Sequence, residues 1–99
     1  MEVVILSGAD ADLDEIYAFL EESSGGDKFL HSLDRKLELL RTFPEIAPRA
    51  QVSKLRQTRI GKTPYGVFYS IEGKRLMIVA IQDLRQDPKT IARIIRGRL

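Results

Sequence analysis

Residues Tyr65–Ile81 read YGVFYSIEGKRLMIVAI, and this stretch decides the fold. In its first half, aromatic or branched residues occupy every second position, and this period of two is typical of a strand. Glu72-Gly73-Lys74 interrupts the pattern, and a glycine able to adopt positive φ suits a tight connection. The run Leu76–Ile81 is continuously apolar, as a central strand covered on both faces requires. The stretch therefore predicts a β-hairpin whose second strand is central.

The segment before this hairpin is basic and less regular. Lys54–Ile60 carries its apolar residues, Leu55 and Ile60, at opposite parity, and we interpret it as a strand, regular or bulged, with one exposed basic face. Gly61–Pro64 then turns the chain into the hairpin. At the start of the chain, residues 2–6 are nearly all apolar, which favours a short strand buried on both faces.

Two amphipathic helices are predicted between the first strand and the basic segment. We expect Asp10 or Asp12 to cap the first helix and Asp27 to cap the second, because a carboxylate is favourable at the positive end of the helix dipole. The short connection Ser23–Gly26 favours an antiparallel hairpin of the two helices. Their apolar positions repeat at helical spacing, at Leu13, Ile16, Tyr17 and Leu20 and then at Leu30, Leu33, Leu37 and Leu40.

A third helix is predicted after the β-hairpin. Asp87 is placed to cap it and Pro88 to occupy its first position. Its apolar side would consist of Ile91, Ile94 and Ile95, and its basic C-terminal end of Arg93, Arg96 and Arg98. The element order is thus β-α-α-β-β-β-α. It predicts a single α+β domain over residues 1–99, a two-layer sandwich in which the helical hairpin packs on a mainly antiparallel four-stranded sheet, with a C-terminal helix.

The composition narrows the function classes. The 99 residues are 43% hydrophobic and 30% charged, an ordinary globular profile, and cysteine is absent, so disulfides and thiolate metal sites are excluded. The sequence shows neither a glycine-rich phosphate loop nor metal-ligand spacing, so we expect no cofactor and no metal. The apolar start is too short for a signal peptide or a membrane span, and we expect a cytoplasmic protein without membrane association.

Charge is strongly segregated along the chain. Residues 1–45 hold eleven acidic and four basic residues (net −7), whereas residues 46–99 hold three acidic and twelve basic ones (net +9). No acidic residue occurs between Ile46 and Ile71. Such segregation is the usual footprint of an anionic partner, although acidic helices folding against a basic sheet would produce the same split.

The order and local features of the chain resemble the RelE/ParE superfamily of toxins from type II toxin–antitoxin systems, and especially its ParE branch. The resemblance covers nearly the whole chain. It is carried by the acidic first helix around Ala11–Ile16, the second helix ending in Leu39–Pro44, the basic strand Leu55–Ile60, the aromatic strand Pro64–Ile71, and the segment Ala80–Pro88.

The resemblance implies a growth-inhibiting toxin that a cognate antitoxin neutralises in a hetero-oligomer. RelE-like members cleave mRNA on the ribosome with a basic patch, and Arg56, Arg59 and Arg85 fall where such enzymes carry basic residues. ParE-like members are linked to inhibition of DNA gyrase and have no established catalytic residues. The resemblance and the charge pattern together give a target-binding set of Lys54, Arg56, Arg59, Lys62 and Arg85.

Proton-transfer groups are scarce, which favours the ParE branch. Cleavage of RNA needs a group that accepts and donates protons, most often His, Glu, Lys or Tyr. The single histidine, His31, falls in the second helix, Asp83 stands where many relatives have histidine, and no tyrosine follows Tyr69. We therefore predict a gyrase inhibitor, with a ribosome-dependent mRNA endoribonuclease and an inactive toxin-like binding module as the alternatives. The antitoxin is expected to lay an acidic, partly disordered segment on the basic sheet or on the helical hairpin.

Overall fold

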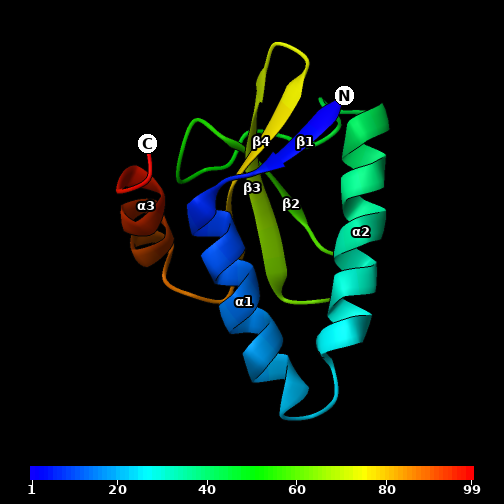
Figure 1. Cartoon of the computed structure of the whole chain (residues 1–99). Coiled ribbons are helices and arrows are strands. Elements are labelled where there is room, and N and C mark those ends of the chain that lie inside the picture. The colour runs from blue at the N-terminus through cyan, green and yellow to red at the C-terminus, as the bar shows by residue number, and fades with distance from the viewer.

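The computed structural model describes residues 1–99 and contains the seven predicted elements in the predicted order. The strands form one sheet in the order β1-β4-β3-β2 (Figure 1). β1 runs parallel to β4, and the other two pairings are antiparallel, so the sheet is mixed but mainly antiparallel, as expected. The strands are β1 (Glu2–Ile5), β2 (Arg56–Arg59), β3 (Tyr65–Glu72) and β4 (Arg75–Asp83).

The hairpin of β3 and β4 is confirmed, and it contains a bulge that the sequence pattern does not reveal. The turn places Gly73 at φ 62°, the left-handed region that favours glycine. Phe68 pairs with Ala80 and Tyr69 with Ile78, so Val79 is the additional residue in β4. Because of this extra residue, the faces of β4 switch in mid-strand. Ile78 and Ile81 both join the core under the helical hairpin, whereas Val79 and Ala80 point to the other face.

Helices α1 (Ser7–Glu21) and α2 (Gly26–Thr42) form an antiparallel hairpin on one face of the sheet (Figure 1). Of the predicted stripes, Ile16, Leu33 and Leu40 are buried there, and Leu13, Leu20, Leu30 and Leu37 pack half-buried against the core. Tyr17 stays partly exposed, and its hydroxyl donates to Oδ1 of Asp27 at 3.1 Å. α2 ends just before Phe43-Pro44 as expected. Apolar burial of this kind is the main stabilising term in a domain of this size. The core beneath the hairpin includes Ile16, Phe29, Leu33, Leu40, Val67, Tyr69, Ile78 and Ile81.

The predicted caps of the first two helices are wrong. α1 begins at Ser7, so that Asp10 lies in its first turn and Asp12 lies inside the helix, where it is buried. α2 begins at Gly26, and no side chain caps it from the preceding residue. Instead the Gly26 N–H donates to Oε1 of Glu21 at 2.9 Å. The cap of α2 is thus supplied by the end of α1, which a pattern within α2 alone does not indicate.

The first strand differs from its prediction. β1 is an edge strand rather than one buried on both faces: Val3 and Val4 are half-buried, and Glu2 and Ile5 are exposed. Its apolar residues are explained by its parallel pairing with β4, the strand that lies in the interior of the sheet. A four-residue apolar run does not by itself distinguish an edge strand from a central one.

Helix α3 (Pro88–Arg96) covers the opposite face of the sheet. Its cap is confirmed, since Oδ1 of Asp87 accepts the Lys89 N–H at 2.8 Å and Pro88 occupies the first helical position. Ile91 and Ile95 form a second, smaller core with Leu55, Phe68, Val79 and Ala80. None of the three helices combines the length and apolar character needed to cross a membrane.

Candidate functional site

The two arginines of β2 lie on opposite faces of the sheet, so the prediction of one exposed basic face is wrong. Side chains alternate along a strand, and residues 56 and 59 have opposite parity. The Arg56 side of β2 faces α2, because Nζ of Lys36 donates to Oγ1 of Thr58 at 3.3 Å. The Arg59 side faces α3, because Gln57 and Phe68 line a hollow beside Ile91. Arg59 itself is exposed and pairs with Gly66 of β3.

Arg56 is engaged with the backbone of its own chain. Its Nη1 donates to the carbonyl oxygen of Ala47 at 2.6 Å and to that of Glu45 at 3.2 Å. Beside it, the hydroxyl of Tyr69 donates to the carbonyl oxygen of Pro44 at 2.7 Å, and burial raises the pKa of this phenol. These bonds fasten the segment after α2 to the sheet. Arg56 therefore has an evident structural task, in addition to any role in target binding.

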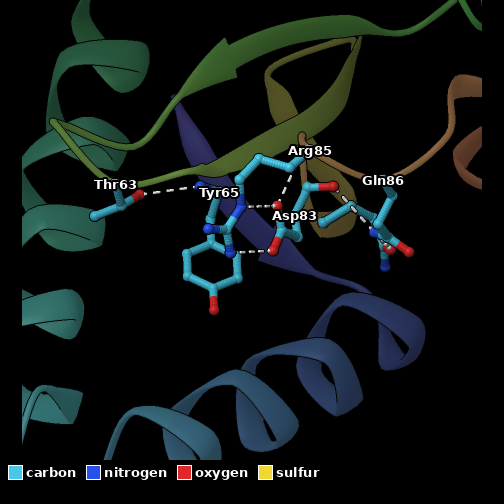
Figure 2. Close-up of polar contacts among 6 residues, drawn as sticks. Thr63, Tyr65, Asp83, Arg85 and Gln86 are labelled. Carbon is cyan, nitrogen blue, oxygen red and sulfur yellow. Dashed lines mark hydrogen bonds and ion pairs between the residues drawn. The ribbon is translucent and has the colours of Figure 1, made fainter. Parts of the chain in front are cut away.

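Arg85 forms a compact ion pair with Asp83, two residues earlier (Figure 2). Oδ2 of Asp83 accepts from Nη2 of Arg85 at 2.7 Å, while Oδ1 accepts from its Nε at 3.0 Å and from its backbone N–H at 2.9 Å. The hydrogen bonds from the guanidinium are the main reason that the pKa of Asp83 is lowered. Both groups are therefore charged at neutral pH, and neither is suited to proton transfer there.

Tyr65 lies beside this ion pair and is almost fully buried (Figure 2). Its ring packs edge-on against Phe29 with centroids 5.3 Å apart, and both residues belong to the core under the helical hairpin. Burial, reinforced by the nearby Asp83 carboxylate, raises the pKa of the phenol. The hydroxyl therefore stays protonated at neutral pH and can donate a hydrogen bond, but it is a poor general base.

A second aspartate–arginine pair was not predicted from the sequence. Arg98 donates from Nη1 to Oδ2 of Asp12 at 2.6 Å and from Nη2 to Oδ1 at 2.8 Å. Oδ2 of Asp12 also accepts the Ile81 N–H at 3.0 Å, and Nη1 of Arg98 reaches the carbonyl oxygen of Val79 at 3.1 Å. The pair thus covers the part of β4 that lies beyond the end of β1. One signal was present: Asp12 precedes Ile16 by four positions, so it falls on the apolar stripe of α1.

The remaining predicted residues lie on separate parts of the surface. Lys54 is exposed in the loop before β2, where its carbonyl oxygen accepts from Arg49 at 3.1 Å. Lys62 is exposed at the turn before β3, beside α2. There it shares a hollow with three further cations that were not predicted as site residues, Lys28, Arg35 and Lys36. The structure does not bring the five predicted residues together into one catalytic cluster.

These positions define what the surface can do. Exposed guanidinium and ammonium groups can hold an anionic partner, and no group of His, Asp or Glu side chains converges in a way that could hold a metal ion. The fold and surface are those of a small α+β protein whose exposed cations are dispersed rather than gathered with acid–base groups.

Comparison with known proteins gives the family. Residues 3–88 match the model of the ParE toxin of the type II toxin–antitoxin system parDE. The chain therefore belongs to the ParE toxin family. A solved structure described as the chromosomal ParDE TA system from P. aeruginosa has a similar fold, with a TM-score of 0.64 and 22% sequence identity over 84% of this chain and 95% of that chain. No match is found among curated protein sequences.

Proposed function

We propose that this ParE-type toxin inhibits DNA gyrase and is neutralised by a cognate antitoxin. The observation that carries the proposal is the family match over residues 3–88. The geometry supports it, because the predicted cations lie in β2 and in three separate loops or turns, which suits a broad contact with a large partner. Among the predicted residues, Lys54, Arg59, Lys62 and Arg85 are exposed and available to a target.

The ribonuclease alternative is less well supported by the same geometry. It would require Arg56, Arg59 and Arg85 to act on one scissile phosphate. Arg56 is bonded to backbone carbonyls on the α2 side, while Arg59 projects from the α3 side of the strand. Arg85 is already paired with Asp83, and the lowered pKa of that carboxylate makes it a weak base.

Supercoiling of relaxed plasmid by purified gyrase tests the proposed target directly. We expect the wild-type toxin to reduce supercoiling at micromolar concentration, and Arg59→Ala to weaken this inhibition by roughly tenfold, the loss typical of one good charged contact at an interface. Arg75→Ala is the matched control, because Arg75 is also exposed but pairs with Glu2 of β1. Unchanged supercoiling at micromolar toxin, together with cleavage of translated mRNA, would replace this proposal with the ribonuclease function.

Neutralisation is tested by co-expression. The antitoxin is expected to be a small acidic protein encoded beside the toxin gene. Induction of the toxin alone should arrest growth, and co-expression of that protein should restore it. Normal growth after induction of the toxin alone would instead indicate an inactive, toxin-like binding module.

A further inference from the structure

A hollow lies between α2 and the turn that joins β2 to β3. Its volume is about 800 Å³, and Phe29 and Tyr65 contribute to its floor. One wall is the outer side of α2, and the other is the turn Gly61–Pro64. We call this hollow the α2 groove. It is distinct from the Asp83–Arg85 ion pair, whose residues line a separate hollow on the other side of Tyr65.

The α2 groove carries positive charge that no acidic lining residue balances. Four of its 13 lining residues are basic and none is acidic; the basic ones are Lys28, Arg35, Lys36 and Lys62. None of these four belongs to any of the ion pairs of the molecule. Lys36 donates only to the neutral hydroxyl of Thr58. Like charges gathered along one groove, with no carboxylate facing them, create a potential that favours an anionic partner.

The groove also has an apolar component at its far end. Leu39 lines it and is 38% exposed, and Phe43, the residue directly after α2, is 57% exposed. Exposed large apolar side chains next to a charged groove are typical of protein-binding surfaces. Phe29 and Tyr65, by contrast, are only 2% and 6% exposed, so their rings offer little surface on which a nucleobase could stack.

We propose that the α2 groove docks an acidic, amphipathic segment of a partner protein, with carboxylates on its cations and apolar side chains over Leu39 and Phe43. A nucleic-acid backbone would satisfy the cations but would leave the apolar end unmatched. This inference rests on the proposed neutralisation by an antitoxin, whose docking face it identifies as the α2 side of the helical hairpin. Docking there would bury apolar surface and neutralise charge at the same time.

Fluorescence anisotropy with synthetic probes tests the α2 groove. The probe is a labelled 16-residue peptide designed as an amphipathic helix. Leucines at i, i+3, i+4 and i+7 form one face of this helix, and glutamates form the opposite face. The comparison probes are a scrambled peptide of the same composition, the same pattern with lysine in place of glutamate, and a 16-nucleotide single-stranded RNA. We expect the wild-type protein to bind the acidic amphipathic peptide more tightly than any of the three.

A matched pair of charge reversals locates the binding. Lys28→Glu with Arg35→Glu should weaken peptide binding by roughly tenfold or more, since both cations face the α2 groove. Lys74→Glu with Lys89→Glu changes the net charge equally at exposed positions outside the groove, and it should weaken binding by less than about threefold through long-range attraction alone. Melting followed by circular dichroism checks the fold of both, and Lys28→Gln with Arg35→Gln replaces the first pair if the reversal does not fold.

The outcomes are decisive in either direction. Equal weakening by the two pairs of reversals, equal affinity for the scrambled peptide, tighter binding of the RNA, or no binding of the peptide would each overturn the proposal. Supercoiling assays with the same proteins keep it separate from the gyrase proposal. Peptide binding in the α2 groove by a protein that leaves gyrase unaffected would overturn only the target, whereas gyrase inhibition without peptide binding would overturn only the docking face.

Discussion

The protein contains two aspartate–arginine pairs with nearly the same bond lengths and very different surroundings. In the Asp12–Arg98 pair the side chains are 10% and 24% exposed, and the partners are 86 positions apart. In the Asp83–Arg85 pair the side chains are 26% and 71% exposed, and the partners are two positions apart. The first joins α1, β4 and the segment after α3, while the second stays within one turn of chain (Figure 2).

The difference shows that the bond lengths of an ion pair do not by themselves determine how much the pair contributes to the stability of the fold. An exposed pair between near neighbours is screened by water and constrains little of the fold. A buried pair that also binds backbone groups leaves several polar atoms without partners when it is broken. We therefore expect the Asp12–Arg98 pair to govern stability, and the Asp83–Arg85 pair to be open to rearrangement when a target binds.

Removal of Asp12 should produce the largest effect. Asp12→Ala leaves the Arg98 guanidinium without its carboxylate and the Ile81 N–H without its acceptor in a mostly buried place, which costs about 3 kcal/mol of unfolding free energy. Urea unfolding followed by circular dichroism measures this loss. Asp14→Ala, on the exposed side of the same helix, is the control and should change the unfolding free energy by less than about 0.5 kcal/mol. Equal losses in the two variants would remove the distinction drawn between the two pairs.

Gly8 offers an intermediate effect whose sign depends on Arg98. A Cβ at position 8 would lie 2.7 Å from Nε and 2.8 Å from Cδ of Arg98, so this side chain must shift in Gly8→Ala, which disturbs its contact with Asp12. In the wild-type background we expect a loss of about 1 kcal/mol as the ion pair is disturbed. In an Arg98→Ala background the space is free, and the better helix propensity of alanine should stabilise the protein by about 0.5 kcal/mol. Thermal melts of the four proteins in this cycle decide whether the sign reverses.

The exposed pair should yield the smallest effect, visible as a change in titration rather than in fold. The pKa of Asp83 is lowered mainly by hydrogen bonds from Arg85, so Arg85→Ala should raise this pKa toward the ordinary value of 3.8. Carboxyl chemical shifts followed by NMR during a pH titration measure the change, and Arg75→Ala serves as the control. An unchanged pKa in Arg85→Ala would show that the pair is not formed in solution.

The lowered pKa of Asp83 also determines how the stability of the fold depends on pH. Since the folded pKa of Asp83 lies below the unfolded one, the carboxylate stabilises the fold above the unfolded pKa. This contribution disappears as the pH falls through the folded pKa. Below about pH 4, near the ordinary pKa of aspartate, stability should therefore fall less steeply with pH in Arg85→Ala than in the wild type. Urea unfolding at a series of acidic pH values checks this expectation.

Local patterns predicted most of the fold. The β3–β4 hairpin, the ends of the helical hairpin near Phe43-Pro44 and the cap at Asp87 each depend on neighbouring residues, and all three are confirmed. The bulge at Val79 was missed because the apolar run reads the same whether the faces switch or not. The edge position of β1 was missed because the sequence of a four-residue strand does not reveal which strands it pairs with.

The candidate site was harder to predict, for a related reason. Charge counts identified the basic half of the chain, but they did not reveal which face each cation would occupy. Arg56 and Arg59 were placed on one face although their spacing separates them in a regular strand. Lys28 and Arg35 were overlooked because they belong to the acidic half, and only the packing of α2 beside the Gly61–Pro64 turn brings them to Lys62. The part of the five predicted residues in target binding stays a prediction.

The long sequence separation of Asp12 and Arg98 has a consequence for biosynthesis. Asp12 leaves the ribosome early, whereas its partner follows 86 positions later. Until then the nascent chain carries a carboxylate on the apolar side of α1 with no arginine to neutralise it, and long-range contacts of this kind form late. A nascent chain stalled before Arg98 therefore lacks the ion pair that joins α1 and β4 to the segment after α3.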